Sequence, residues 1–100
     1  ILLLEGEFHL RNLEFKKAVG VLNKASTQEY AEEYSFRLLM LAYYYNGDRM
    51  QAIDIYINLT NYLKEYLDVG PSKITEELYL LIKSDREVPV KSMGKWINLD

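Results

Sequence analysis

The stretch NGDRMQAIDIY, residues 46–56, decides how this chain folds. Asn46-Gly47 favours a left-handed backbone turn that ends a helix, because glycine adopts this conformation without steric strain. Asp48 and Gln51 have the spacing of a capping box, in which two side chains satisfy the first free N–H groups of the following helix. The stretch therefore predicts a tight hairpin of two helices.

Apolar residues on both sides of this turn recur every three or four positions, which is the period of an α-helix. Before the turn they predict a helix over residues 29–46, which starts with a capping box at Ser26 and Glu29. The apolar stripe of this helix consists of Tyr30, Tyr34, Leu38, Leu41, Ala42 and Tyr45. A second helix is predicted to run to about Leu67, and apolar residues on more than one of its faces indicate that it packs between layers.

An internal repeat extends this hairpin to the rest of the chain. A shift of 34 residues places Glu14–Leu22 on Asp48–Tyr56 and keeps acidic, small and apolar residues in the same order. Shifts of this size are typical of helical-hairpin repeats. The other predicted helices cover residues 1–10, residues 14–25 and a segment from Ser72 to about Asp85. The sequence thus predicts an all-α solenoid of about five helices.

Four motifs share their order and spacing with a known family. They are EFKKA at residues 14–18, Leu39-Met40, NGDRMQAIDIY at 46–56 and LKEYLDVGPS at 63–72. Together they resemble the bacterial transcriptional activator domain over about residues 1–86. That family is a tetratricopeptide-like domain, found beside a winged-helix DNA-binding domain in activators of the Streptomyces antibiotic regulatory protein type and in related response regulators. The resemblance implies a tetratricopeptide-like solenoid that takes part in transcription regulation.

The two ends of the chain lead to separate expectations. The first residue is Ile and an apolar tetrapeptide opens the chain, so we expect residues 1–86 to be an N-terminally truncated fragment of a longer protein. Residues 87–100 contain Pro89 and Gly94 but are strongly apolar. We expect this tail either to cap the exposed end of its own solenoid or to contact a linker or partner through Trp96.

The amino-acid composition limits the classes of protein to which this chain can belong. Leu, Ile, Val and Phe make up 31 of the 100 residues, which is enough for a folded core. The absence of cysteine fits a reducing compartment, so we expect a cytoplasmic protein. The longest aliphatic run, Ile1–Leu4, is far too short to span a membrane.

Catalytic and nucleic-acid-binding chemistry find little support in the residues. His9 is the only histidine, and we expect no enzyme activity, metal site or cofactor. Residues 26–86 carry 6 basic and 10 acidic side chains, and the whole chain has a net charge of −3. Since DNA binding requires clustered cations, we expect no direct contact with nucleic acid.

Protein recognition has positive support. The resemblance places Tyr34, Arg37, Leu41, Tyr44 and Tyr45 at positions that commonly face a ligand in the concave groove of tetratricopeptide hairpins. Tyrosine and arginine are enriched at binding hot spots, because they combine a large contact area with a polar end.

Among these tyrosines and their neighbours, we expect different degrees of exposure. Tyr44 and Arg37 are predicted to be exposed in the groove, whereas Tyr43 and Tyr56 are predicted to lie in the core.

The sequence therefore predicts a regulatory protein-interaction domain of a cytoplasmic bacterial transcriptional regulator. The expected partner is the regulator's own DNA-binding domain, the transcription machinery, or a second subunit, which would give a homodimer. A generic tetratricopeptide adaptor unrelated to transcription is the alternative, and a helical enzyme fragment is a third, more distant class.

Overall fold

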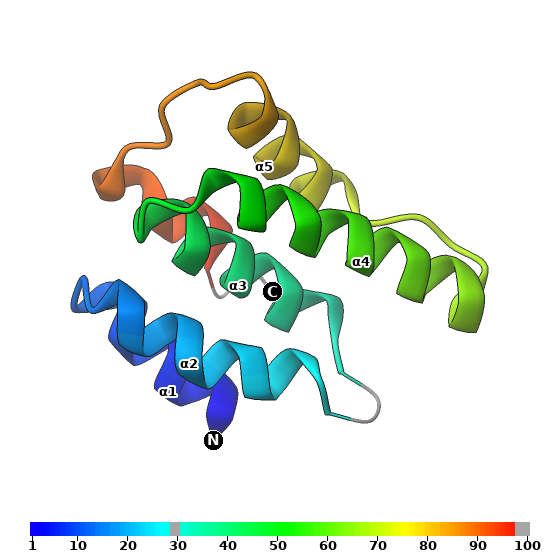
Figure 1. Ribbon diagram of the computed structural model, residues 1–100, viewed down its shortest axis with the longest axis horizontal. Helices are drawn as coiled ribbons and strands as arrows, with labels where there is room; N and C mark the ends of the chain where they lie inside the picture. The colour runs from blue at the N-terminus through cyan, green and yellow to red at the C-terminus, as the bar shows by residue number, and fades with distance from the viewer. Residues whose placement is uncertain (29–30, 98–100) are drawn as a thin grey trace.

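The computed structural model describes residues 1–28 and 31–97, and every regular element in these ranges is helical. The elements are α1 (Leu2–Arg11), α2 (Phe15–Ser26), α3 (Glu33–Tyr45), α4 (Arg49–Leu67), α5 (Lys73–Lys83) and the 3₁₀-helix η1 (Val90–Trp96). Helices α1 and α2 form one hairpin, α3 and α4 form a second, and α5 lies beside α4 (Figure 1). This arrangement confirms the predicted all-α, tetratricopeptide-like solenoid.

The turn between α3 and α4 follows the sequence prediction closely. Gly47 has a φ of 86°, which is the left-handed conformation expected of it. The Asp48 side chain accepts a hydrogen bond from the N–H of Gln51 at 3.2 Å and so caps α4. Helix α4 then runs to Leu67, as predicted. The observed turn therefore has the glycine conformation and the helix cap that the local sequence predicts.

The start of α3 differs from the prediction. Helix α2 continues through Ser26, whose hydroxyl donates to the carbonyl of Asn23 at 3.1 Å, so this side chain cannot cap the next helix. Helix α3 begins at Glu33 rather than at residue 29. The predicted partner of Ser26, Glu29, lies outside the described residues together with Tyr30.

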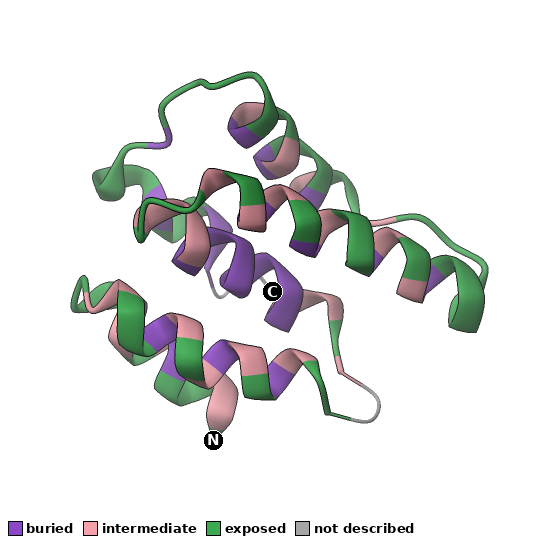
Figure 2. Cartoon of the chain, viewed as in Figure 1, coloured by how far each residue is buried: buried purple, intermediate pink, exposed green. Residues whose placement is uncertain are grey.

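Helix α3 is the central layer of the molecule. Every residue from Ser35 to Ala42 is buried, so that this helix is covered on all sides (Figure 2). Helix α4 buries only one stripe, formed by Ala52, Ile55, Leu59 and Leu63. Helix α4 nevertheless contacts both α3 and α5, and its Tyr56 stacks on Tyr79 of α5, so it packs between these two helices as predicted. Helix α3 is more deeply buried than α4, and α2 and α4 flank it on two sides.

Two mid-helix glycines give matched tests of this packing. An added Cβ at Gly6 of α1 would lie 2.3 Å from Cδ2 of Leu22, a fully buried side chain, whereas one at Gly20 of α2 would meet nothing within 4 Å. We expect Gly6→Ala to lower the free energy of unfolding by about 1–3 kcal/mol through overpacking. Gly20→Ala should raise it by about 0.5–1 kcal/mol, because alanine has the higher helix propensity. Urea unfolding followed by circular dichroism measures both, and equal signs would contradict this packing.

Candidate functional site

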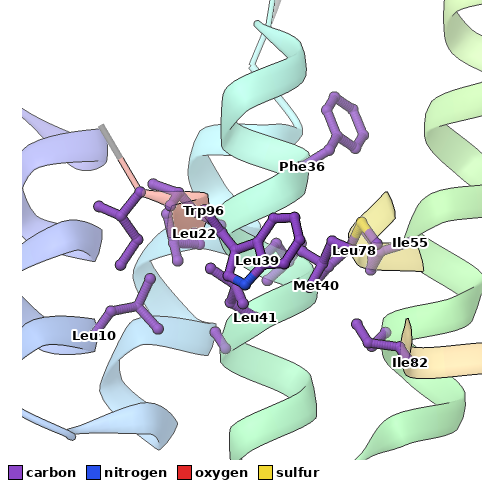
Figure 3. Close-up of a cluster of buried hydrophobic side chains, with 14 of the residues drawn as sticks. Leu10, Leu22, Phe36, Leu39, Met40, Leu41, Ile55, Leu78, Ile82 and Trp96 are labelled. Atoms are coloured by element: carbon purple, nitrogen blue, oxygen red, sulfur yellow. The ribbon is translucent and has the colours of Figure 1, made fainter. Parts of the chain in front are cut away.

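The chain occupies its own predicted groove. After α5 it crosses back over the molecule, so that residues 88–97, here called the tail segment, lie beside α3 (Figure 1). Four apolar side chains of the tail segment are buried, with 2–6% of their surface exposed. They are Val88, Met93, Trp96 and Ile97. Trp96 belongs to the same buried cluster as Leu39 and Leu41 of α3 (Figure 3).

Three of the predicted groove residues hold the backbone of the tail segment. The Tyr44 hydroxyl accepts from the N–H of Val88 at 3.1 Å, and the Tyr45 hydroxyl donates to the carbonyl of Pro89 at 3.4 Å. At the other end, Nε of Arg37 donates to the carbonyl of Trp96 at 2.9 Å. Since residue 37 precedes residues 44 and 45, the tail segment runs antiparallel to α3.

Arg37 also connects α3 with α5. Its Nη1 donates to the Thr75 hydroxyl at 3.1 Å, and that hydroxyl donates to the carboxylate of Glu33 at 2.5 Å. The same carboxylate accepts from the N–H of Ser72 at 3.1 Å, at the start of α5. Burial lowers the pKa of Arg37, while the nearby Glu33 charge opposes this shift. The guanidinium is therefore a buried cation that links α3, α5 and the tail segment.

The predicted exposure of the groove residues was wrong for Arg37. It is only 5% exposed, and Leu41 is fully buried, because the tail segment and α5 cover this side of α3. Tyr34, Tyr44 and Tyr45 are half-buried, so the expectation that Tyr44 is exposed holds only in part. The Tyr34 ring lies under the Arg37 guanidinium, 5.0 Å from its carbon.

The two tyrosines predicted to lie in the core are also half-buried. The Tyr43 hydroxyl accepts from the Asn23 side chain at 2.8 Å, which joins α3 to α2. The Tyr56 ring stacks on Tyr79 of α5 with ring centroids 3.8 Å apart. Both rings therefore pack at the edge of the core, and the Tyr43 hydroxyl keeps a polar contact there.

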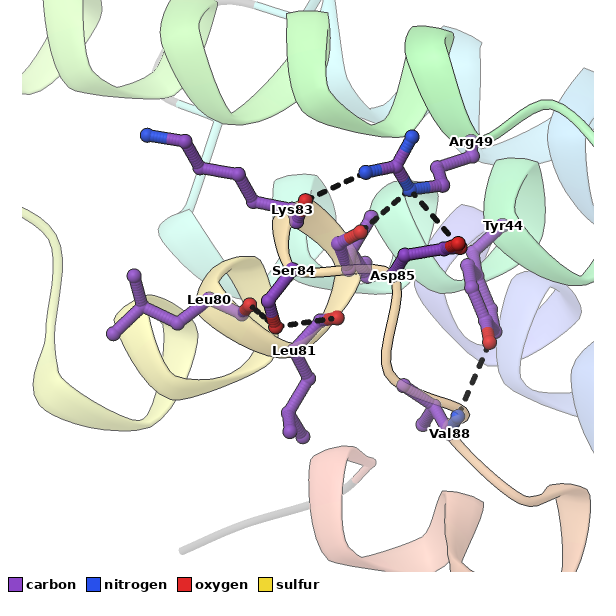
Figure 4. A network of polar contacts seen from close by, with 9 residues as sticks. Tyr44, Arg49, Leu80, Leu81, Lys83, Ser84, Asp85 and Val88 are labelled. Atoms are coloured by element: carbon purple, nitrogen blue, oxygen red, sulfur yellow. Dashed lines mark hydrogen bonds and ion pairs between the residues drawn. The ribbon is translucent and has the colours of Figure 1, made fainter.

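Arg49, which the sequence did not single out, binds the end of α5 just before the chain continues into the tail segment (Figure 4). Its Nε donates to the carbonyl of Ile82 at 2.7 Å and its Nη2 to that of Lys83 at 2.6 Å, at the C-terminal end of α5. A cation at this position satisfies free carbonyls and complements the helix dipole. Arg49 belongs to the quoted motif NGDRMQAIDIY, but the motif alone does not say which distant carbonyls it meets.

The other chemically interesting residues have structural roles. Nδ1 of His9 lies 3.0 Å from a carboxylate oxygen of Glu14, which joins the end of α1 to the start of α2. Hydrogen bonds from His9 and Lys17 lower the pKa of Glu14. Over residues 1–28 and 31–97, no group of three or more His, Cys, Asp or Glu side chains could hold a metal ion. None of the helices described is both long enough and apolar enough to cross a membrane.

Tyr45 gives the tail segment a pH dependence. Burial, with a smaller contribution from Tyr44, raises its pKa from 10.0 to about 12. A raised pKa means that the folded state favours the neutral phenol, so this contribution to stability is complete below pH 10 and is lost as the pH rises towards 12. Ionisation also removes the proton that Tyr45 donates to Pro89.

We therefore expect the emission of Trp96, the single tryptophan, to shift to the red between pH 10 and about 12 as the tail segment loosens. Tyr45→Phe cannot ionise at this position, and its emission should change less over the same range. Identical titrations of the two proteins would show that Tyr45 does not control the tail segment.

Comparison with known proteins assigns the fold to a family. The family model described as the bacterial transcriptional activator domain matches residues 2–83, which includes α1 to α5 and excludes the tail segment. Comparisons with curated proteins and with solved structures returned no significant match. Because the family model covers most of the chain and the observed helices follow the expected repeat, the chain belongs to the bacterial transcriptional activator domain family.

Proposed function

We propose that this domain is the regulatory protein-interaction module of a bacterial DNA-binding transcriptional regulator. On this proposal, DNA is bound by a part of the regulator outside these 100 residues, and the protein acts in the cytoplasm. The domain would bind the regulator's own DNA-binding domain, a second subunit or the transcription machinery. Family membership supports the role in transcription, and the net charge of −3 argues against binding of DNA by this chain itself.

The observation that carries the interaction role is the way α3 holds an extended segment. Arg37, Tyr44 and Tyr45 present a guanidinium and two hydroxyls to backbone groups of residues 88–96. Side chains that bind backbone, next to buried seats for apolar side chains, are the general features of peptide-binding grooves. The α3 face therefore has the chemistry to receive a segment of another protein.

A reporter experiment tests the proposal. The regulator without these 100 residues should still bind its operator but should lose activation of a reporter gene, because the contact to the partner is gone. Gel-shift analysis of the shortened regulator is the control for intact DNA binding. The isolated 100-residue chain should not retard the operator fragment at physiological salt. Activation that survives the deletion, or retardation by the isolated chain, would overturn the proposal.

A further inference from the structure

We propose that the tail segment is a built-in substitute for a partner peptide, and that the α3 groove takes a partner segment of the same chemistry. That segment presents two apolar side chains three residues apart, the second of them aromatic, and displaces residues 88–97. The inference rests on the proposed function, since it names the kind of partner and the regulation of the same site. The tail segment lies outside the family match at residues 2–83.

The groove recognises backbone, which makes its occupant exchangeable. Each of its three hydrogen bonds to the tail segment uses a main-chain group, namely the N–H of Val88 and the carbonyls of Pro89 and Trp96. Any segment that follows the same path offers these groups. Lys95 and Glu77 form the ion pair between the tail segment and α5, with 4.0 Å between the charged atoms and both side chains largely exposed. Such a pair contributes little to affinity.

Selectivity comes from the buried apolar side chains. Met93 and Trp96 are three residues apart in η1, and residues with this spacing lie on the same side of a 3₁₀-helix. Both are buried against the core, with 6% and 2% of their surface exposed. A competing segment must therefore fill two adjacent buried positions, one with a flexible apolar side chain and one with an aromatic ring.

Three features make the tail segment replaceable. Seven residues of 3₁₀-helix have poor intrinsic stability, so η1 depends on its contacts with the groove. The buried indole Nε1 of Trp96 has no hydrogen-bond partner within the described residues, which destabilises the bound tail segment. Residues 84–87, which connect α5 to the tail segment, are all exposed, so this connection buries no side chain. A partner segment with Phe at the position of Trp96 would have no unsatisfied indole N–H.

The experiment uses the single tryptophan of the chain. A synthetic peptide of residues 86–97 supplies the only indole when it is mixed with full-length chains carrying Trp96→Ala or Trp96→Phe. Trp96→Ala weakens the chain's own tail segment, whereas Trp96→Phe keeps an aromatic ring at this position. The peptide emission should shift to the blue on binding, with about tenfold higher affinity for the Trp96→Ala chain, because its tethered competitor is weaker.

Two controls complete the design. A peptide with Met93→Asp should not bind, and adding Tyr44→Phe and Tyr45→Phe to the Trp96→Ala chain should weaken binding of the unmodified peptide several-fold. If the Trp96→Ala chain loses its helical circular dichroism, two other chains are compared instead. These are the Trp96→Phe chain and the chain that carries both Trp96→Phe and Met93→Ala, and the second should bind the peptide more tightly. Equal affinity of the two chains, or no blue shift with a helical Trp96→Ala chain, would overturn the inference.

The peptide-binding assay and the reporter assay can each contradict one proposal without contradicting the other. Peptide binding as expected, together with activation that survives deletion of the domain, would support the groove and overturn the proposed role in activation. Loss of activation on deletion, together with no peptide binding, would support that role and overturn the groove as its peptide site.

Discussion

Replacing Arg37 by alanine should lower the free energy of unfolding by about 2–4 kcal/mol, although an arginine in a predicted binding groove would be expected to tolerate this change. The substitution removes the hydrogen bonds to the Trp96 carbonyl and to Thr75. The carbonyl of a residue that is 2% exposed then loses a charged donor. Hydrogen bonds to charged groups in buried positions are among the stronger ones, so the loss is large.

Urea unfolding with far-UV circular dichroism measures the Arg37 effect, and Trp96 emission reports the tail segment in the same samples. Arg37→Lys keeps the positive charge but lacks the planar fork that reaches two acceptors, so an intermediate loss is expected. Arg86→Ala, an exposed arginine in the connection to the tail segment, should change stability by less than about 0.5 kcal/mol. An Arg37→Ala effect as small as that of Arg86→Ala would mean that Arg37 is not a buried link.

Replacing Leu39 by alanine should cost about 2–5 kcal/mol, because the side chain is fully buried in the core and its removal leaves a cavity. Leu39 does not belong to the apolar stripe predicted for this helix, so a reading of one buried face would place it near the surface. Figure 3 shows it among the labelled side chains of the buried cluster.

Leu80→Ala is the matched control for Leu39→Ala. Leu80→Ala removes the same side-chain volume at a helical position that is 52% exposed. The free energy of unfolding of this variant should fall by no more than about 0.5 kcal/mol. Both variants are compared by their urea midpoints and slopes. Similar losses in the two proteins would contradict the burial of α3 on all sides.

Much of the fold was predictable because it depends on residues close together in the chain. The 34-residue shift aligns α2 with α4, and each helix starts directly after an acidic residue, Glu14 or Asp48. Gly47 and Asp48 set the tight turn by backbone freedom and capping. The start of α3 was harder to predict, since Ser26 can bond either to the next helix or to the preceding turn of its own helix, and the sequence does not rank the two.

The sequence predicted where the candidate site lies on α3, but not that a segment of the same chain occupies it. Arg37, Tyr44 and Tyr45 do lie on one side of α3, and they bind an extended segment. That segment belongs to the chain itself, which explains why Arg37 and Leu41 are buried. Whether a tail contacts its own groove or another molecule depends on the path between α5 and η1, and at the start of this path Arg49, from a helix far away in sequence, binds the last carbonyls of α5.

The sequence by itself therefore determined the helical hairpins, their repeat and the turn that joins α3 to α4, because helix periodicity, capping and glycine conformation act over a few residues. Only the tertiary structure decided which helix is central and what fills the groove. Burial of α3 on every side requires α2, α4, α5 and the tail segment together, and the bond from Arg37 to Trp96 joins residues 59 positions apart. Contacts of this range depend on how all the helices pack at once, and no local pattern encodes them.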